Sequence, residues 1–234
     1  MKRLVLAVIA ASALLSAPAL AVSVTGVGDV WSVEYDGRLD VGGVSTVMDG
    51  LAAGVQYRVF DEYYNAAINR TFVGIDITII NRTDAAIWEQ ASVTGIGFNT
   101  DPDVKRWGSS VTGDYDYLVL GAPLPTSDGF RVELCVARWS GSCSGPQGSG
   151  TEIGETGHAR VYLAFAGNLT NSAIEFSNFG IRYSWVRDDQ RGIIYGQGLG
   201  VPRTPPVPEP ASAAVFAVGA LMVGAALRRR VRTS

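Results

Sequence analysis

Alternation of apolar and polar side chains constrains the fold of this chain more than any other feature. β-branched residues occupy every second position from Val73 to Ile79, a spacing that directs one face of a β-strand into a core. The same period returns at 132–136 and 161–165. Further strands are expected at 29–35, 55–61, 92–98 and 174–185. Because no window of comparable length has a convincing helical stripe, the pattern predicts an all-β chain.

Short strands separated by Gly-rich turns are typical of antiparallel folds. We therefore expect a single antiparallel β-sandwich, jelly-roll-like in topology, over residues 22–200, a length that supports one sizeable core. A barrel and a β-solenoid are the alternatives, although the chain has no fixed-period repeat.

The amino end has the features of an export signal. Lys2 and Arg3 precede an apolar run over residues 4–15, and Ala-Leu-Ala at 19–21 supplies the small residues of a cleavage site. We assign residues 1–21 to a signal peptide and expect the mature chain to begin at Val22. An uncleaved anchor is the alternative.

The carboxyl end has three consecutive parts. A short motif, a run of seventeen uncharged residues at 211–227 and a basic tail at 228–234 follow one another. The motif consists of Val207, Pro208, Glu209 and Pro210. Seventeen helical residues span about 25 Å, close to the shortest length that crosses a hydrocarbon core of about 30 Å. The pattern predicts a transmembrane helix, for which an ordinary stop-transfer anchor is the simplest interpretation.

This order of motif, apolar helix and arginines resembles the PEP-CTERM sorting signal of bacterial exported proteins. The resemblance implies that a membrane-embedded exosortase recognises and processes the chain, which then reaches the cell surface or an extracellular layer of exopolysaccharide or biofilm. It implies no catalytic activity. The prolines at 201–206 predict an extended spacer without regular strand or helix between the β-domain and this signal.

A second resemblance covers the domain itself. Residues 73–83, 86–89 and 95–104 are similar to the PEP-CTERM group called the cistern family, and so are the cysteine pair and residues 176–183. This resemblance implies export and pairing of the two cysteines, and it carries no assigned activity.

The exported part of the chain is acidic. Residues 1–21 and 228–234 contain six of the 19 basic residues and no acidic residue, so residues 22–227 hold 13 basic and 22 acidic side chains, a formal charge of −9. Such a surface suits solubility and argues against nucleic acid as a partner.

The two cysteines, Cys135 and Cys143, are an even and closely spaced pair, which outside the cytoplasm favours a disulfide over free or redox-sensing thiols. His158 is the single histidine, so a zinc site lacks ligands and a Ser-His-Asp triad would depend on this residue alone. We expect His158 at an exposed strand entry. No catalytic residue, metal ligand or cofactor is assigned.

Two acidic pairs are candidates for calcium ligands, whereas the two carboxylates that a glycoside hydrolase needs cannot be chosen from the sequence alone. Asp101 and Asp103 form one pair, and Asp114 and Asp116 form the other. Each pair offers only two of the six to eight oxygens that Ca²⁺ takes, so the signal is weak.

Aromatic residues in polar contexts are the candidates for sugar binding. Trp107 and Trp139 have such contexts, whereas Trp31, Trp88 and Trp185 fit a core or its rim. The sequence as a whole predicts an exported, non-catalytic protein associated with exopolysaccharide. The alternatives are a carbohydrate-binding module that uses Trp107 or Trp139, and a glycan-active hydrolase.

Overall fold

The computed structural model describes residues 21–41, 44–121, 132–139, 143, 150–170, 172–188 and 192–203. Their strands are β1 Val22–Val24, β2 Val30–Val41, β3 Val44–Asn65, β4 Arg70–Asn81, β5 Gln90–Asp101, β6 Lys105–Gly113, β7 Tyr117–Leu120, β8 Leu134–Ala137, β9 Thr156–Ala166, β10 Ile174–Asp188 and β11 Gly192–Arg203. The strand pairings are antiparallel, and no membrane-spanning helix occurs in these ranges. The predicted all-β antiparallel fold is confirmed.

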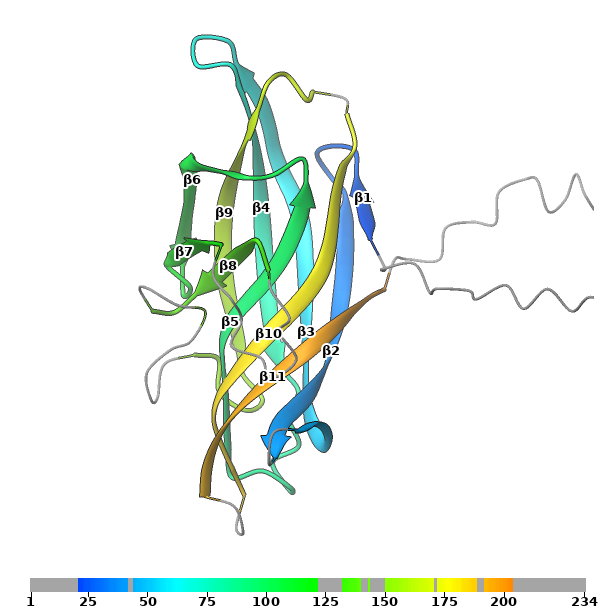
Figure 1. Ribbon diagram of the computed structural model, residues 1–234, viewed down its shortest axis with the longest axis vertical. Coiled ribbons are helices and arrows are strands. Elements are labelled where there is room, and N and C mark those ends of the chain that lie inside the picture. Colours follow the sequence, from blue (N-terminus) through cyan, green and yellow to red (C-terminus); the bar gives the residue numbers. More distant parts are fainter. Residues whose placement is uncertain are drawn as a thin grey trace, which may run out of the picture.

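The strands form one large sheet in the order β6-β9-β4-β3-β2-β11-β10-β5-β8-β7, with β1 added beside β10. The sheet curls until its end strands β6 and β7 approach each other, so that it nearly closes into a barrel (Figure 1). The sequence predicted a jelly-roll-like sandwich, in which two sheets face each other. The strands are long enough, at 12 residues for β2 and 22 for β3, for the sheet twist to wrap a single sheet around the core.

Bulges bend the long strands along this curve. In β10 the register with β5 shifts between Ser177 and Gly180, and Asn178 within this shift has a φ of 49°. A second shift in β10 contains Trp185, with a φ of 58°. In β3 the register with β4 shifts at Phe60. A bulge adds a residue to one strand and increases its local twist, which helps a single sheet to curl.

The interior is packed with apolar side chains from opposite sides of the curled sheet. Its centre is an aromatic cluster of Trp31, Tyr57, Phe98, Phe176 and Phe179. Trp31 stacks on Tyr57 with ring centroids 5.0 Å apart, and Tyr57 meets Phe98 edge to face at 6.0 Å. Each such side chain contributes roughly 1.5–3 kcal/mol by leaving water. Because the alternating β4 residues face this core, the other face of β4 is available to solvent or to a ligand.

The strands expected from alternation are all present, and four further strands were missed: β1, β6, β7 and β11. One expectation was wrong. Residues 201–203 were assigned to the extended spacer, but β11 continues to Arg203 and pairs Val201, Pro202 and Arg203 with β2. Beyond Leu199, β11 pairs with β2 alone. Pro202 therefore lies in a part of β11 that has a hydrogen-bonded neighbour on one side, where the missing N–H of proline is tolerated.

Candidate functional site

The outer face of β3, β4, β9 and β6 carries the most conspicuous polar surface of the described fold. A groove of about 560 Å³ crosses these four strands, and we call it the outer groove. Its lining residues are Gln56, Arg58, Asp76, Ile77, Thr78, Thr112, Gly113, His158, Ala159 and Arg160. Side chains alternate between the two faces of a strand. The polar lining residues face outward because their neighbours in sequence, such as Ile75 and Ile77 in β4, face the core.

Strand register aligns the groove residues in two rows. Arg58, Asp76, Arg160 and Thr112 are successive cross-strand partners, and Gln56, Thr78 and His158 form the next row. Cross-strand partners on one face have Cβ atoms about 5 Å apart, so each row presents its side chains together.

Arg160 is the most constrained side chain of the groove. Its Nε and Nη2 donate hydrogen bonds to the two carboxylate oxygens of Asp76 at 2.7 and 3.2 Å, and its guanidinium lies 4.3 Å from the ring centre of Phe60. The hydrogen bonds and the charge of Asp76 raise the pKa of Arg160 above its ordinary value. Because both groups satisfy each other, Asp76 is a poor candidate for a base or a metal ligand.

Arg58 lies in the same row and differs from Arg160 in its partners. Its side chain is exposed and forms no hydrogen bond or ion pair with the described part of the chain. A free guanidinium with five donors in a fixed fork suits a planar anion such as a carboxylate.

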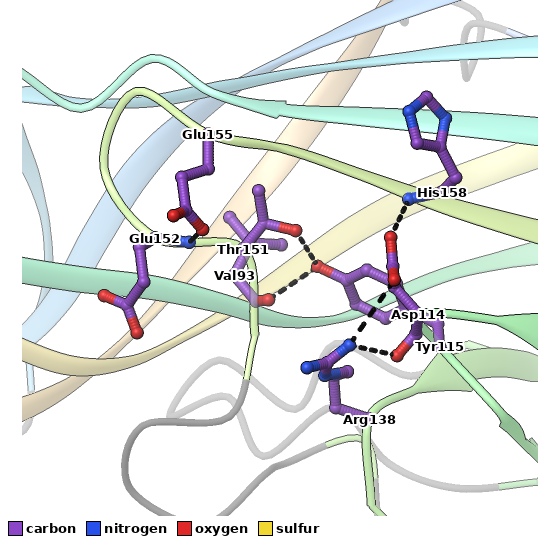
Figure 2. Close-up of polar contacts among 8 residues, drawn as sticks. All are labelled: Val93, Asp114, Tyr115, Arg138, Thr151, Glu152, Glu155 and His158. Atoms are coloured by element: carbon purple, nitrogen blue, oxygen red, sulfur yellow. Dashed lines mark hydrogen bonds and ion pairs between the residues drawn. The ribbon is translucent and has the colours of Figure 1, made fainter.

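One rim of the groove is held by the turn that joins β6 to β7 (Figure 2). The Asp114 carboxylate accepts a hydrogen bond from the backbone N–H of His158 at 2.8 Å, and the Asp114 carbonyl accepts one from Arg138 at 2.6 Å. Tyr115 is buried beside them, and its hydroxyl lies 2.6 Å from the carbonyl of Val93. Burial raises the pKa of this phenol. The turn therefore ties β9 to the end of β8 and fixes the groove where the sheet nearly closes.

The face continues past the groove to a second cluster, which we call the aromatic end. Trp107, in β6, is 67% exposed, and the guanidinium of Arg70 lies 5.4 Å from the centre of its ring. Tyr63 is 45% exposed and stacks on Phe72 with ring centroids 5.0 Å apart. Phe72 and Asp76 lie four residues apart on the same face of β4, a separation of about 13 Å.

Two further rings connect the outer groove to the aromatic end. The Phe60 ring covers Gly74, where an added Cβ would approach to 2.7 Å. Phe60 packs edge to face on Tyr162 at 5.4 Å, and the Tyr162 hydroxyl donates to Asp61 at 3.2 Å. Polar and aromatic side chains thus follow one another along the whole outer face.

The structure places the two predicted sugar-binding tryptophans in different settings. Trp107 belongs to the aromatic end, whereas Trp139 follows β8 and is 52% exposed without a ring contact in the described part of the chain. Trp31 and Trp88 are buried and Trp185 is half-buried, as their core or rim assignment requires. His158 is the third residue of β9 and exposed, which confirms its expected place at a strand entry.

The predicted disulfide is confirmed. Cys135 and Cys143 are joined, with Cα atoms 5.8 Å apart, and both are fully buried. They pack with Val132 and Ala137 in a small cluster outside the main core. The bridge therefore has a structural position, away from the outer groove.

The acidic pairs do not assemble a calcium site within the described residues, where no group of three or more His, Cys, Asp or Glu side chains gathers. Asp114 is engaged by the backbone of His158 and lies 3.9 Å from Arg138. Asp101, Asp103 and Asp116 are exposed.

Sequence reasoning singled out Trp107 but missed Arg58, Arg160, Tyr63 and Arg70. These residues occupy outward positions of alternating strands, a signal that the sequence contains, but their meeting on one face depends on strand register. The sorting motif at 207–210, the predicted helix at 211–227 and the signal peptide lie outside the described residues. Comparisons with protein-family models, with curated proteins and with solved structures find no match to the chain. Function is therefore inferred from its own residues.

Proposed function

We propose that this chain is an exported, non-catalytic protein of the cell surface or extracellular matrix that associates with exopolysaccharide through its outer face. The observation that carries the proposal is the exposed ring of Trp107 beside Arg70, in line with a polar groove. A flat aromatic ring presents an apolar surface to the C–H groups of a sugar, while nearby guanidinium and amide groups donate to its hydroxyls.

The described lining residues of the outer groove support a non-catalytic role. Glycoside hydrolases use two carboxylic groups on either side of the scissile bond. Among the described lining residues Asp76 is the one carboxylate, and Arg160 occupies both of its oxygens. The ring of His158 contacts Thr78, while Asp114 contacts the backbone nitrogen of His158 and not its ring. These contacts favour binding over catalysis.

Export is proposed from the two ends of the chain. The signal peptide at 1–21 and the resemblance of 207–234 to a PEP-CTERM signal support passage through the inner membrane, with an exosortase and the membrane as partners of the tail helix. The disulfide between Cys135 and Cys143 suits an oxidising compartment.

A binding measurement tests the glycan claim. The full chain, purified in mild detergent, is titrated with polysaccharide isolated from the host envelope. We expect Trp107→Ala to weaken binding about five- to thirtyfold, because a lost stacking contact of about 1–2 kcal/mol corresponds to that factor. Trp139→Ala is the matched control, an equally drastic change at an exposed tryptophan away from the face. Equal affinities of the wild-type chain and Trp107→Ala would contradict the proposal.

A further inference from the structure

The outer face collects cations that have no counter-ion in the described structure. Five described arginines form ion pairs: Arg38, Arg82, Arg138, Arg160 and Arg187. Four other basic residues, Arg58, Arg70, Lys105 and Arg106, form no ion pair with the described residues, and all four lie on β3, β4 or β6.

This concentration is opposite in sign to the charge of the exported chain, which is −9 over residues 22–227. Two carboxylates of this face are already engaged, Asp76 by Arg160 and Asp61 by Tyr162. Surface charges usually keep a protein soluble. Cations that serve only this purpose on an acidic surface would form ion pairs with neighbouring carboxylates. Arg58 and Arg70 are unpaired cations on the outer face of an acidic protein, and they indicate an anionic ligand.

Arg70 supports this interpretation from its own surroundings. Its guanidinium stacks on Trp107, and one of its terminal nitrogens, Nη1, is buried without a hydrogen-bond acceptor. A buried donor without a partner costs free energy, so the hydrogen-bonding capacity of this guanidinium is not used up within the described fold. An aromatic ring and an anion-binding fork therefore meet at one point.

We propose that the outer face binds an acidic polysaccharide, whose carboxylates contact Arg70 and Arg58 while a sugar ring stacks on Trp107. This inference rests on the proposed function and adds the chemical class of the glycan. Arg70 and Asp76 are six residues apart in β4, so the two arginines are separated by about 20 Å along the strands. A single sugar cannot reach both, so the ligand is a polymer.

The alternative anion is nucleic acid, which also offers rings and charges. Sequence-independent binding of nucleic acid depends on neutralising several phosphates with Lys and Arg, whereas the two arginines proposed to contact the ligand lie about 20 Å apart.

The test compares polygalacturonate, which has a carboxylate on every ring, with uncharged dextran and with single-stranded DNA, each titrated against the full chain in mild detergent. We expect polygalacturonate to bind best, and Arg58→Gln or Arg70→Gln to weaken it about three- to tenfold each, since each removes a charge-assisted contact. Arg187→Gln is the control: it removes an equal charge from β10 and should leave affinity unchanged. The C-terminal arginines are common to all variants, and thermal unfolding checks that each variant is folded.

The outcomes separate this inference from the proposed function. Equal binding of dextran and polygalacturonate, lost in Trp107→Ala but kept in both arginine variants, would overturn the acidic ligand while leaving glycan binding in place. Preference for DNA, or equal losses in Arg187→Gln and Arg58→Gln, would also overturn it. Failure of every glycan, including the host polysaccharide, would overturn both.

Discussion

Four tyrosines, Tyr35, Tyr57, Tyr115 and Tyr183, are buried among apolar side chains, and each hydroxyl is kept from water. Burial raises the pKa of each phenol above its ordinary value near 10. The hydroxyl of Tyr35 lies 3.1 Å from the hydroxyl of Tyr57. These residues belong to the core and to the region where the sheet nearly closes, and not to the outer face. They are expected to link the stability of the fold to alkaline pH.

The sign of this linkage follows from proton binding. Above about pH 10 the phenols of the unfolded chain lose protons that the buried phenols keep, so the unfolded state is favoured increasingly. Stability is therefore fully present below about pH 10, and each buried phenol removes up to about 1.4 kcal/mol per further pH unit. Urea unfolding across this range, with phenolate absorbance as a second readout, measures it. Titration of all nine tyrosines near pH 10 in a still folded chain would contradict this account.

At the scale of single elements, β2 shows how closely neighbouring strands pack. Its register with β3 shifts between Asp36 and Arg38, and the side chain of Leu51 fills the space over Gly37. A Cβ at Gly37 would lie 2.1 Å from a carbon of that side chain. The two strands meet closely enough here that only glycine fits.

Gly37→Ala should therefore lower the free energy of unfolding by about 1–3 kcal/mol, the usual cost of overpacking a core. Gly54→Ala is the matched control in β3, because its methyl would meet only the flexible end of Arg82, at 2.8 Å. Urea denaturation of both variants measures the difference. A Gly37→Ala chain as stable as Gly54→Ala would show that Leu51 moves aside freely.

The same elements show what the sequence can predict. β4 and β9 were predicted because β-branched and aromatic residues alternate over a full strand. β6 was missed because most of its residues are exposed and no alternation marks it. β11 was missed because glycines dilute its pattern and its last residues were assigned to the spacer. The same difference applies to the candidate site. Trp107 could be selected from its sequence context, whereas the cross-strand pairing of Arg58 with Asp76 depends on strand register, which local patterns do not encode.

At the scale of the whole molecule, the described chain is a single curled sheet, for which we propose a glycan-binding outer face and an export signal at each end. The sheet nearly closes around a packed aromatic interior, so ligand contact is expected on the outside and not within it. Residues 22–227 have a formal charge of −9, and the cations of β3, β4 and β6 form a local exception to it. A matrix protein of this design would bind glycan along one face and need no lid or enclosed cavity.

Intact mass of the protein, recovered from the envelope and the medium of its native host and of a strain without exosortase, tests the central claim most directly. We predict a chain that begins at Val22, lacks residues 211–234 only where exosortase is present, and gains about 2 Da when the disulfide between Cys135 and Cys143 is reduced. A chain that keeps residues 211–234 in both strains would contradict the account, because the protein would then remain an ordinary membrane-anchored β-domain.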